Sequence, residues 1–246
     1  MDLKYHFLRF KLKFFSRHFK ANEYSYLLKK RGVRVGDNCA FFQPQTMNID
    51  VTRPHLLSIG NNVVVTAGVT ILTHDYSRVV FCNHDVFCNV GEARETIIGN
   101  NVFIGINSIV LMGTKIGNNS IIGAGSVVSG VFPDNSIIAG NPAKVICSID
   151  DFYEKRKKEE VGASIIFAKK YFQCFKRKPT IQDMTNAFSW LYIPRTNESI
   201  HKYTSLFNLN GVDRERYLKK FLSSAPMFDS YEDFLNFVFK EEQYDE

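Results

Sequence analysis

The sequence has few of the features that mark secreted or membrane-spanning proteins. Its five cysteines are an odd number without CxxC or zinc-type spacing, which argues against a disulfide framework and predicts reduced thiols. No run approaches the roughly 18 apolar residues of a membrane span. Lys and Arg interrupt every apolar run near the N-terminus, so no secretory signal is expected. With 246 residues, 45% hydrophobic and 23% charged, the composition predicts a cytoplasmic globular protein.

Charge is scarce in the middle of the chain and concentrated at its start. Residues 1–34 contain ten Lys or Arg and two Asp or Glu, which gives +8. Residues 35–149 contain five Lys or Arg and seven Asp or Glu, which gives −2. Residues 150–246 contain 16 residues of each sign, which gives zero. The net charge of +6 therefore lies essentially in an N-terminal arm.

A repeat of six residues occupies the middle region. Glycine or asparagine follows most of the aliphatic positions of the main frame, which are Ile98, Ile104, Val110, Ile116, Ile122 and Val128. An earlier frame, broken at Arg53, consists of Val35, Phe41, Met47, Ile59, Val65 and Ile71. This period fits a strand and a turn per unit, stacked into a solenoid with one shared core. The 27 residues from Ile71 to Ile98 exceed one repeat by 21, so we expect a loop insertion at about 73–96.

The region resembles the hexapeptide-repeat acyltransferases over roughly residues 33–147. Its closing stretch, Ile122-Gly-Ala-Gly-Ser126 and then Ala139-Gly-Asn-Pro-Ala-Lys144, is similar to the galactoside and maltose acetyltransferase branch and to capsule and lipopolysaccharide O-acetyltransferases. The resemblance implies a mainly β fold, a left-handed parallel β-helix of hexapeptide repeats, assembled as a homotrimer with active sites between subunits. Together with the charge and helical patterns at the two ends, this predicts a basic helical arm at 1–32, the β-helix at 33–149 and an α-helical extension at 150–246.

His74 is the candidate general base. Transfer of an acetyl group from a thioester to a sugar hydroxyl requires a base, because an unactivated hydroxyl is a poor nucleophile. Histidine is the side chain that most readily supplies one at neutral pH. His74 lies at the mouth of the expected insertion, and the resemblance implies that a histidine on this loop is the base.

The resemblance also implies a site for acetyl-CoA, the expected co-substrate, without a metal. The backbone N–H of Ile106 is expected to hold the thioester carbonyl, and Ala124, one coil of 18 residues later, to stack above it. The expected cofactor contacts are Phe103, Gly105, Ile106, Asn107, Gly123, Ala124, Ser129, Gly130 and Lys144. The sequence departs from the family at Gly130, Phe103 and Cys147, where lysine, tryptophan and arginine are common, which weakens the expected phosphate end of the site.

Polar residues around the insertion are candidates for the acceptor site. The resemblance places acceptor contacts near Asn48 and Asp50, and we expect His84 to help shape the acceptor pocket. Asp75 is expected to bind acceptor or orient His74, and an Asx-type turn is the other interpretation of this residue. The two cysteines of the insertion have no marks of a nucleophile.

The two ends of the chain predict helices. Residues 1–31 fit one helix with two apolar rows, Leu3, Phe7, Phe10 and Phe14 against Leu8, Leu12, Phe15 and Phe19. One row can cap the solenoid, and the other can meet a second subunit or, through residues 1–20, an anionic membrane surface; burial of both rows stays open. Nucleic acid is not expected, because no recognition motif accompanies the charge. Helical spacing at 165–175, 184–192, 214–222 and 231–239, with capping signals at Thr180 and Ser230, predicts the C-terminal extension.

The sequence thus predicts an acetyl-CoA-dependent O-acetyltransferase that modifies a sugar hydroxyl of a capsular or lipopolysaccharide glycan or its precursor, in the cytoplasm or at the inner face of the membrane. N-acetylation of an amino sugar on the same scaffold stays open, as does a non-catalytic hexapeptide scaffold. Serine acetylation is less favoured, because those enzymes usually carry a longer N-terminal helical domain. A zinc hydratase of the γ-carbonic-anhydrase type requires three convergent histidines, and the spacing of His55, His74 and His84 does not provide them.

Overall fold

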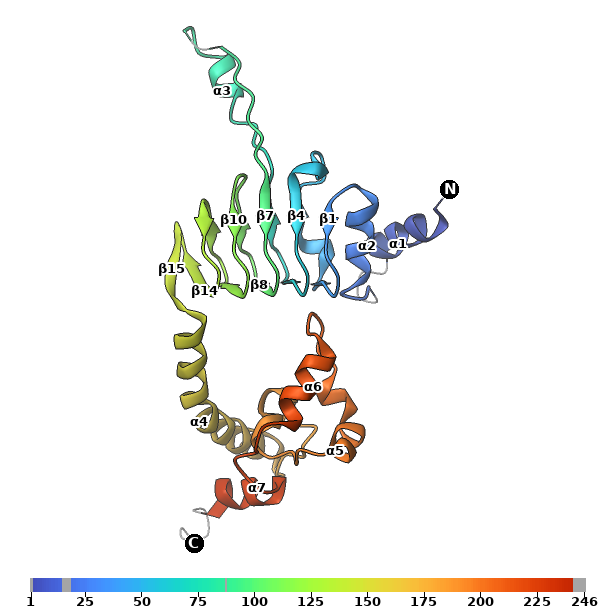
Figure 1. Ribbon diagram of the computed structural model, residues 1–246, viewed down its shortest axis with the longest axis vertical. Coiled ribbons are helices and arrows are strands. Elements are labelled where there is room, and N and C mark those ends of the chain that lie inside the picture. Colours follow the sequence, from blue (N-terminus) through green and yellow to red (C-terminus); the bar gives the residue numbers. More distant parts are fainter. Residues whose placement is uncertain (1, 15–18, 87, 241–246) are drawn as a thin grey trace. The chain divides into compact units, whose positions relative to one another are not determined.

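Short strands follow one another along the hexapeptide region of the computed structural model, which describes residues 2–14, 19–86 and 88–240 (Figure 1). The strands are β1 (Arg34–Val35), β2 (Ala40–Phe41), β3 (Asn48–Ile49), β4 (Leu57–Ile59), β5 (Val64–Val65), β6 (Thr70–Ile71), β7 (Thr96–Ile98), β8 (Val102–Ile104), β9 (Ile109–Val110), β10 (Lys115–Ile116), β11 (Ser120–Ile122), β12 (Val127–Val128), β13 (Val131–Phe132), β14 (Ser136–Gly140) and β15 (Ala143–Ser148). The α-helices are α1 (Leu3–Phe14), α2 (Glu23–Lys30), α3 (Val79–Cys82), α4 (Ile149–Phe175), α5 (Asn197–Lys202), α6 (Arg214–Leu222) and α7 (Tyr231–Phe239). Short 3-10 helices are η2 (Pro44–Thr46), η3 (Pro54–Leu56), η4 (Asn186–Leu191) and η5 (Thr204–Phe207). The chain divides into two compact units, Met1–Phe152 and Tyr153–Glu246. None of the described helices is both long and apolar enough to cross a bilayer.

The strands of the first unit form three sheets that run side by side along a prism. Sheet A has the order β1-β4-β7-β10-β13, sheet B the order β2-β5-β8-β11-β14-β15, and sheet C the order β3-β6-β9-β12. Successive strands enter sheets A, B and C in turn, so three strands and three corners make one coil. The registers Ile98↔Ile116 and Ile104↔Ile122 give the expected coil of 18 residues. The left-handed parallel β-helix with helices at both ends, predicted from the sequence, is confirmed.

The aliphatic positions of the repeat form the core of this unit. The side chains that are at most 1% exposed include Ile71, Ile98, Ile104, Val110, Ile122 and Val128. Burying one such side chain contributes about 1.5–3 kcal/mol. One position of the predicted frame is wrong. In β3 it is Ile49 that points inward, because η2 lengthens the preceding corner, and Met47 packs against the core while only partly buried.

Asparagines form the corner between sheets A and B. Each has a backbone φ between 54° and 59°, a left-handed conformation that asparagine tolerates better than most residues; they are Asn38, Asn62, Asn101, Asn119 and Asn135. Their side-chain amides also bond along the stack, for example Asn119 Nδ2 to Asn135 Oδ1 at 2.9 Å. The corner is therefore held by repeated hydrogen bonds from one coil to the next.

Different elements cover the two ends of the stack. At the first coil, α2 buries Leu27 and Leu28, and the Tyr24 ring lies 5.4 Å from that of Phe41. At the last coil, β15 pairs with β14 in the antiparallel direction, with a shift of register between Ile137 and Ile138. Neither end of the β-helix therefore presents a regular parallel strand edge of sheet B to a further coil.

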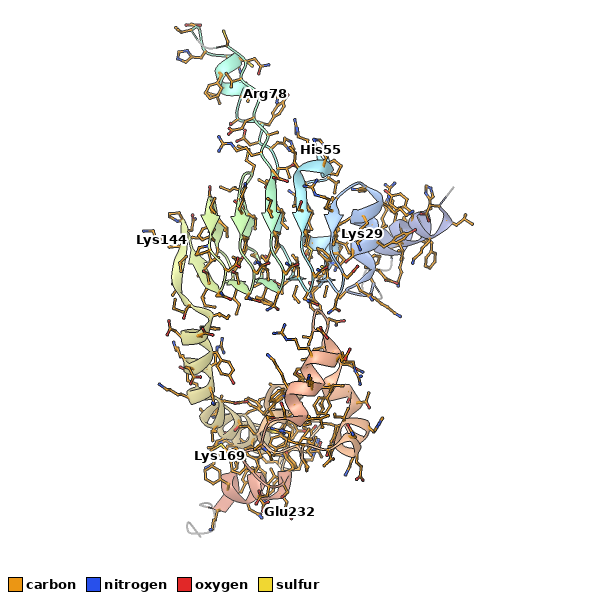
Figure 2. All side chains as sticks on the ribbon, viewed as in Figure 1. Lys29, His55, Arg78, Lys144, Lys169 and Glu232 are labelled. Carbon is orange, nitrogen blue, oxygen red and sulfur yellow. The ribbon has the colours of Figure 1, made fainter. Side chains whose placement is uncertain are left out.

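The insertion leaves the stack between β6 and β7. Its neck is closed by the N–H of Arg94, which donates to the Thr73 carbonyl at 2.9 Å, and by a bridge between His74 and Ala93. Beyond the neck, α3 and its neighbours extend well away from the strands of the same unit (Figure 1). Arg78, just before α3, lies on this extension (Figure 2).

The N-terminal arm contains two helices, not the single helix expected over 1–31. Residues 19–22 are not helical, and the Glu23 carboxylate accepts from the backbone N–H of Lys20 at 2.8 Å, which fixes the start of α2. Phe15 of the second predicted row falls outside the described residues. Leu8 of that row is buried, whereas every member of the first row is exposed, so burial of both rows is wrong within this structure.

The second unit is helical, as expected. Its core contains fully buried aromatic residues, among them Tyr192, Phe221 and Phe234. Ser230 caps α7 by accepting from the N–H of Asp233, as its sequence signal predicts. Two expectations are corrected: the 184–192 segment forms the 3-10 helix η4, and the capping signal at Thr180 leads into turns.

Candidate active site

His74 and Asp50 are brought together at the corner between sheets C and A. Asp50 directly follows β3, and His74 follows β6, which pairs with β3 in the next coil. The His74 Nδ1 lies 2.6 Å from Asp50 Oδ2. The side chain of Asp50 is 4% exposed and that of His74 is 25% exposed. A buried carboxylate therefore holds one nitrogen of a histidine that still reaches solvent.

Hydrogen bonds keep Asp50 ionised. Its Oδ1 accepts from the N–H and hydroxyl of Thr52 at 3.0 and 2.7 Å, and its Oδ2 accepts from the N–H and hydroxyl of Thr73 at 3.1 and 2.5 Å. Burial favours the neutral acid, but the hydrogen bonds from Thr73, Thr52 and His74 outweigh it and hold the pKa of the Asp50 carboxyl well below its ordinary value.

The ionised carboxylate determines the tautomer of His74. A carboxylate can only accept hydrogen bonds, so Nδ1 carries the proton and Nε2 has the free lone pair. No described residue hydrogen bonds to Nε2. The pair can therefore take a proton at Nε2 and stabilise the resulting imidazolium, as a general base requires.

The contact with Asp50 was not expected from the sequence, which placed Asp50 among the acceptor contacts. Among the described residues, the nearly buried carboxylate contacts Thr52, Thr73 and His74. Asp75 does not orient His74 in this structure. Its Oδ1 accepts from the N–H and hydroxyl of Ser77 at 3.0 and 2.8 Å, which is the Asx-type turn.

The expected thioester site lies at the corner between sheets B and C. Ile106 is 48% exposed, and its N–H has no acceptor among the described residues, while its carbonyl accepts from Gly125 at 2.8 Å. A Cβ on Gly105 would lie 2.6 Å from the nitrogen of Ala124. Only a glycine at position 105 permits this close stacking, and Ala124 follows Ile106 by one coil as predicted.

The other expected cofactor residues lie at two corners of the prism, on β8 and at the end of the stack. Phe103 is 41% exposed on β8, whereas Asn107 and Gly123 lie at the corner between sheets B and C. Ser129 and Gly130 are exposed at the corner between sheets C and A, the corner of His74. Lys144 is exposed on β15 at the end of the stack (Figure 2).

Within one chain, His74 and Ile106 occupy different corners of the prism. His74 lies in the segment between β6 and β7, and Ile106 in the segment between β8 and β9. A single chain therefore does not assemble the base and the expected thioester N–H at one corner of a coil.

The expected acceptor residues are not gathered around His74. Asn48 is exposed on β3, two residues before Asp50, and His84 is exposed beyond α3 on the insertion. A cavity of about 380 Å³ lies elsewhere, beside α1 and α2, and one of about 440 Å³ lies along the insertion. The latter is lined by Asp75, Arg78, Glu92 and Arg94 among others, so its wall is rich in charged groups.

Comparisons with known proteins identify the family of the chain. A family model described as bacterial transferase hexapeptide (six repeats) matches residues 95–130. The chain is 43% identical over 143 residues to protein CapG of Staphylococcus aureus, which covers 58% of this chain and 81% of CapG. It is 35% identical over 96 residues to the putative lipopolysaccharide biosynthesis O-acetyl transferase WbbJ of Escherichia coli K12, covering 37% of this chain and 49% of WbbJ.

A further relative is the galactoside O-acetyltransferase of Escherichia coli K12. The chain is 35% identical to it over 106 residues, covering 42% of this chain and 50% of the relative. The chain thus spans about half the length of these two Escherichia coli relatives. The repeats, the three parallel sheets and the extent of the match to CapG lead to one conclusion: the chain belongs to the bacterial hexapeptide-repeat transferase family.

Proposed function

We propose that the protein is an acetyl-CoA-dependent O-acetyltransferase that modifies a sugar hydroxyl of a surface glycan, capsular or lipopolysaccharide, or its precursor. The pairing of His74 with a buried, ionised Asp50 carries the proposal, because it provides a base for an alcohol. The names of two relatives, a galactoside O-acetyltransferase and a putative lipopolysaccharide O-acetyl transferase, support the acetyl group and the sugar acceptor.

The base acts through Nε2, the ring nitrogen that has no hydrogen-bond partner among the described residues. His74 Nε2 removes the proton from the acceptor hydroxyl as its oxygen attacks the thioester carbonyl of acetyl-CoA. Asp50 keeps Nδ1 protonated and stabilises the positive charge that the ring acquires. When the carbon–sulfur bond breaks, the imidazolium returns the proton to the leaving thiolate. The acetyl ester and free CoA are the products.

The thioester oxygen requires hydrogen-bond donors while it carries negative charge. The N–H of Ile106, which has no acceptor within the described ranges, is the donor that we propose, since it lies on an exposed corner and needs no rearrangement to donate. The small, exposed Ala124 leaves the corner open for the pantetheine arm, and Gly105 and Gly123 permit the close stacking of the coils beside it. Phe103 and Asn107 are the other proposed cofactor contacts near Ile106, while Ser129 and Gly130 would contact the cofactor from the corner of His74 and Lys144 from the end of the stack.

The two halves of the site lie on different corners, which supports a homotrimer with active sites between subunits. In such an assembly, the corner of one chain that carries His74 meets the corner of its neighbour that carries Ile106. The insertion, with Asp75 and His84, then has room to contribute to the acceptor pocket, and Asn48 extends from the exposed face beside Asp50.

Release of free thiol from acetyl-CoA tests the proposal. The assay uses a panel of bacterial sugars, amino sugars and oligosaccharides, and compares the unsubstituted chain with His74→Ala and with His55→Ala, an exposed histidine on η3. We expect acceptor-dependent release that falls by about 100-fold or more in His74→Ala and stays unchanged in His55→Ala.

Other outcomes would separate the alternatives. Product analysis that finds an amide instead of an ester would establish N-acetylation of an amino sugar. Release that is indifferent to His74 would overturn the mechanism. If the protein neither releases thiol nor binds acetyl-CoA in a calorimeter, the non-catalytic scaffold is the correct interpretation.

A further inference from the structure

Helix α1 has an apolar row that faces away from the rest of its unit. The exposed fractions along the row are 74% for Leu3, 63% for Phe7, 53% for Phe10 and 60% for Phe14. At about 100° per residue these four side chains fall within an arc of roughly 60°. The rings of Phe10 and Phe14 lie 4.8 Å apart, so the row forms one continuous apolar surface.

The opposite face of α1 holds the helix in this orientation. Leu8 is only 3% exposed. Lys11 Nζ pairs with the Glu23 carboxylate of α2 at 2.8 Å, and Asp2, just before α1, pairs with Lys30 at 2.7 Å. Turning the apolar row inward would break both ion pairs and expose Leu8, so the row is a fixed outer surface of the unit.

Cations lie on both sides of the row. The helical angles place Lys4 on one side, and Lys13 and Arg9 on the other. On the second side, Arg9 and Lys13 join Arg31 of the α2 end in lining the cavity of about 380 Å³. No carboxylate is among the described residues that line this cavity.

We propose that α1 docks on an anionic lipid surface, with the row from Leu3 to Phe14 inserted among the lipids and the flanking cations at the headgroups. An apolar face bordered by Lys and Arg is the pattern of helices that lie in the membrane interface. The arm carries +8, whereas residues 35–149 sum to −2 and residues 150–246 to zero, so the excess positive charge of the chain lies at this helix.

The same charges argue against the other occupants of the row. A second copy of the chain, which has a net charge of +6, and the Tyr153–Glu246 unit both lack a net negative charge to match the basic arm. Nucleic acid would match the charge but not a continuous row of one leucine and three phenylalanines. Docking would place the β-helix next to the membrane, where lipid-linked glycan precursors are located, but it does not depend on the acetyl transfer proposed above.

Sedimentation with vesicles tests this inference on the full chain. Vesicles of phosphatidylcholine alone are compared with an equimolar mixture of phosphatidylcholine and phosphatidylglycerol. We expect binding to the mixture only, weakened by salt because surface charges are screened. Phe7→Ser with Phe14→Ser should lower the partition coefficient by about tenfold or more. Lys4→Gln with Lys13→Gln should lower it by about tenfold.

Matched controls remove similar groups from other exposed positions. Val131→Ser deletes an apolar side chain that is 76% exposed on β13, and Lys155→Gln with Lys157→Gln deletes two exposed charges of α4. These variants should bind like the unsubstituted chain. Because all the positions are exposed, we expect unchanged melting curves. If the Phe7 and Phe14 variant melts differently, Leu3→Ser takes its place.

Three results would overturn the inference. The first is failure of the unsubstituted chain to bind the anionic vesicles. The second is binding that the Phe7 and Phe14 substitutions leave unchanged. The third is a change in oligomeric state, seen by light scattering without lipid, when these two residues are replaced, because the row would then be an interface between chains.

Discussion

Replacing Asp50 with asparagine tests the link between the buried carboxylate and the base. Each carboxylate oxygen accepts a backbone N–H, from Thr52 at Oδ1 and from Thr73 at Oδ2. The amide of Asp50→Asn must direct its NH₂ group at one of them, so neither orientation satisfies all the donors. A buried donor without a partner costs about 1–3 kcal/mol, and we expect a loss of folding stability of that size.

The catalytic effect should be larger than the loss of stability. If the new NH₂ group faces His74, it donates to Nδ1 and moves the ring proton to Nε2, which can then no longer accept one. If it faces Thr52, the imidazolium still lacks its anionic partner. We expect kcat/KM to fall by about 100-fold or more, close to the loss in His74→Ala.

The assay is steady-state thiol release at a temperature where both proteins are folded, checked by circular dichroism. Asp37→Asn is the matched control, because Asp37 is an exposed carboxylate of the same β-helix whose only ion pair among the described residues is with Lys29. A folded Asp50→Asn protein with unchanged kcat/KM would refute the assignment of Asp50 as the partner of the base.

Three other predictions follow from the same structure. Because the Asp50 pKa is lowered in the folded protein, the ionised carboxylate contributes fully to stability above the ordinary carboxyl pKa of about 4, and this contribution declines below that pH. Urea titrations should therefore show that the difference in free energy of unfolding between the unsubstituted chain and Asp50→Asn shrinks as the pH falls below that value. A difference in free energy that is independent of pH would contradict this. Co-refolding equal amounts of His74→Ala and Ala124→Glu chains should restore about a quarter of the active sites if base and cofactor corner come from different subunits, and none if one chain supplies both. Gly105→Ala should destabilise the fold by about 1–3 kcal/mol through its clash with a backbone nitrogen, whereas Gly162→Ala in α4, which meets no atom within 4 Å, should stabilise it by about 0.5–1 kcal/mol; thermal melts that rank the two variants the other way would show the stacking argument to be wrong.

The sequence predicts the β-helix well because its core depends on a local rule. A side chain six residues after Ile98 must be apolar if each side of the coil contributes one inward position, and Ile104 meets that requirement independently of the rest of the fold. The corners also follow local chemistry, since asparagine adopts the left-handed conformation there.

The His74–Asp50 contact could not be predicted in the same way, because it depends on register. The frame of six placed Met47 inward, whereas η2 lengthens the corner and makes Ile49 the inward residue. This shift sets Ile49 beside Ile71 and brings Asp50 under His74. The Pro44 that begins η2 was a signal in the sequence for such an irregular corner.

The two covered ends of the β-helix have a consequence for polymerisation. A stack of coils with nearly constant cross-section is a template on which an identical coil of another molecule could continue all three sheets. Here α2 occupies one end, and at the other the reversed direction and shifted register of β15 mismatch any incoming parallel strand of sheet B. Removing residues 141–148 would expose β14 at one end only, so two molecules could pair through this edge, and growth of filaments would also require removal of α2.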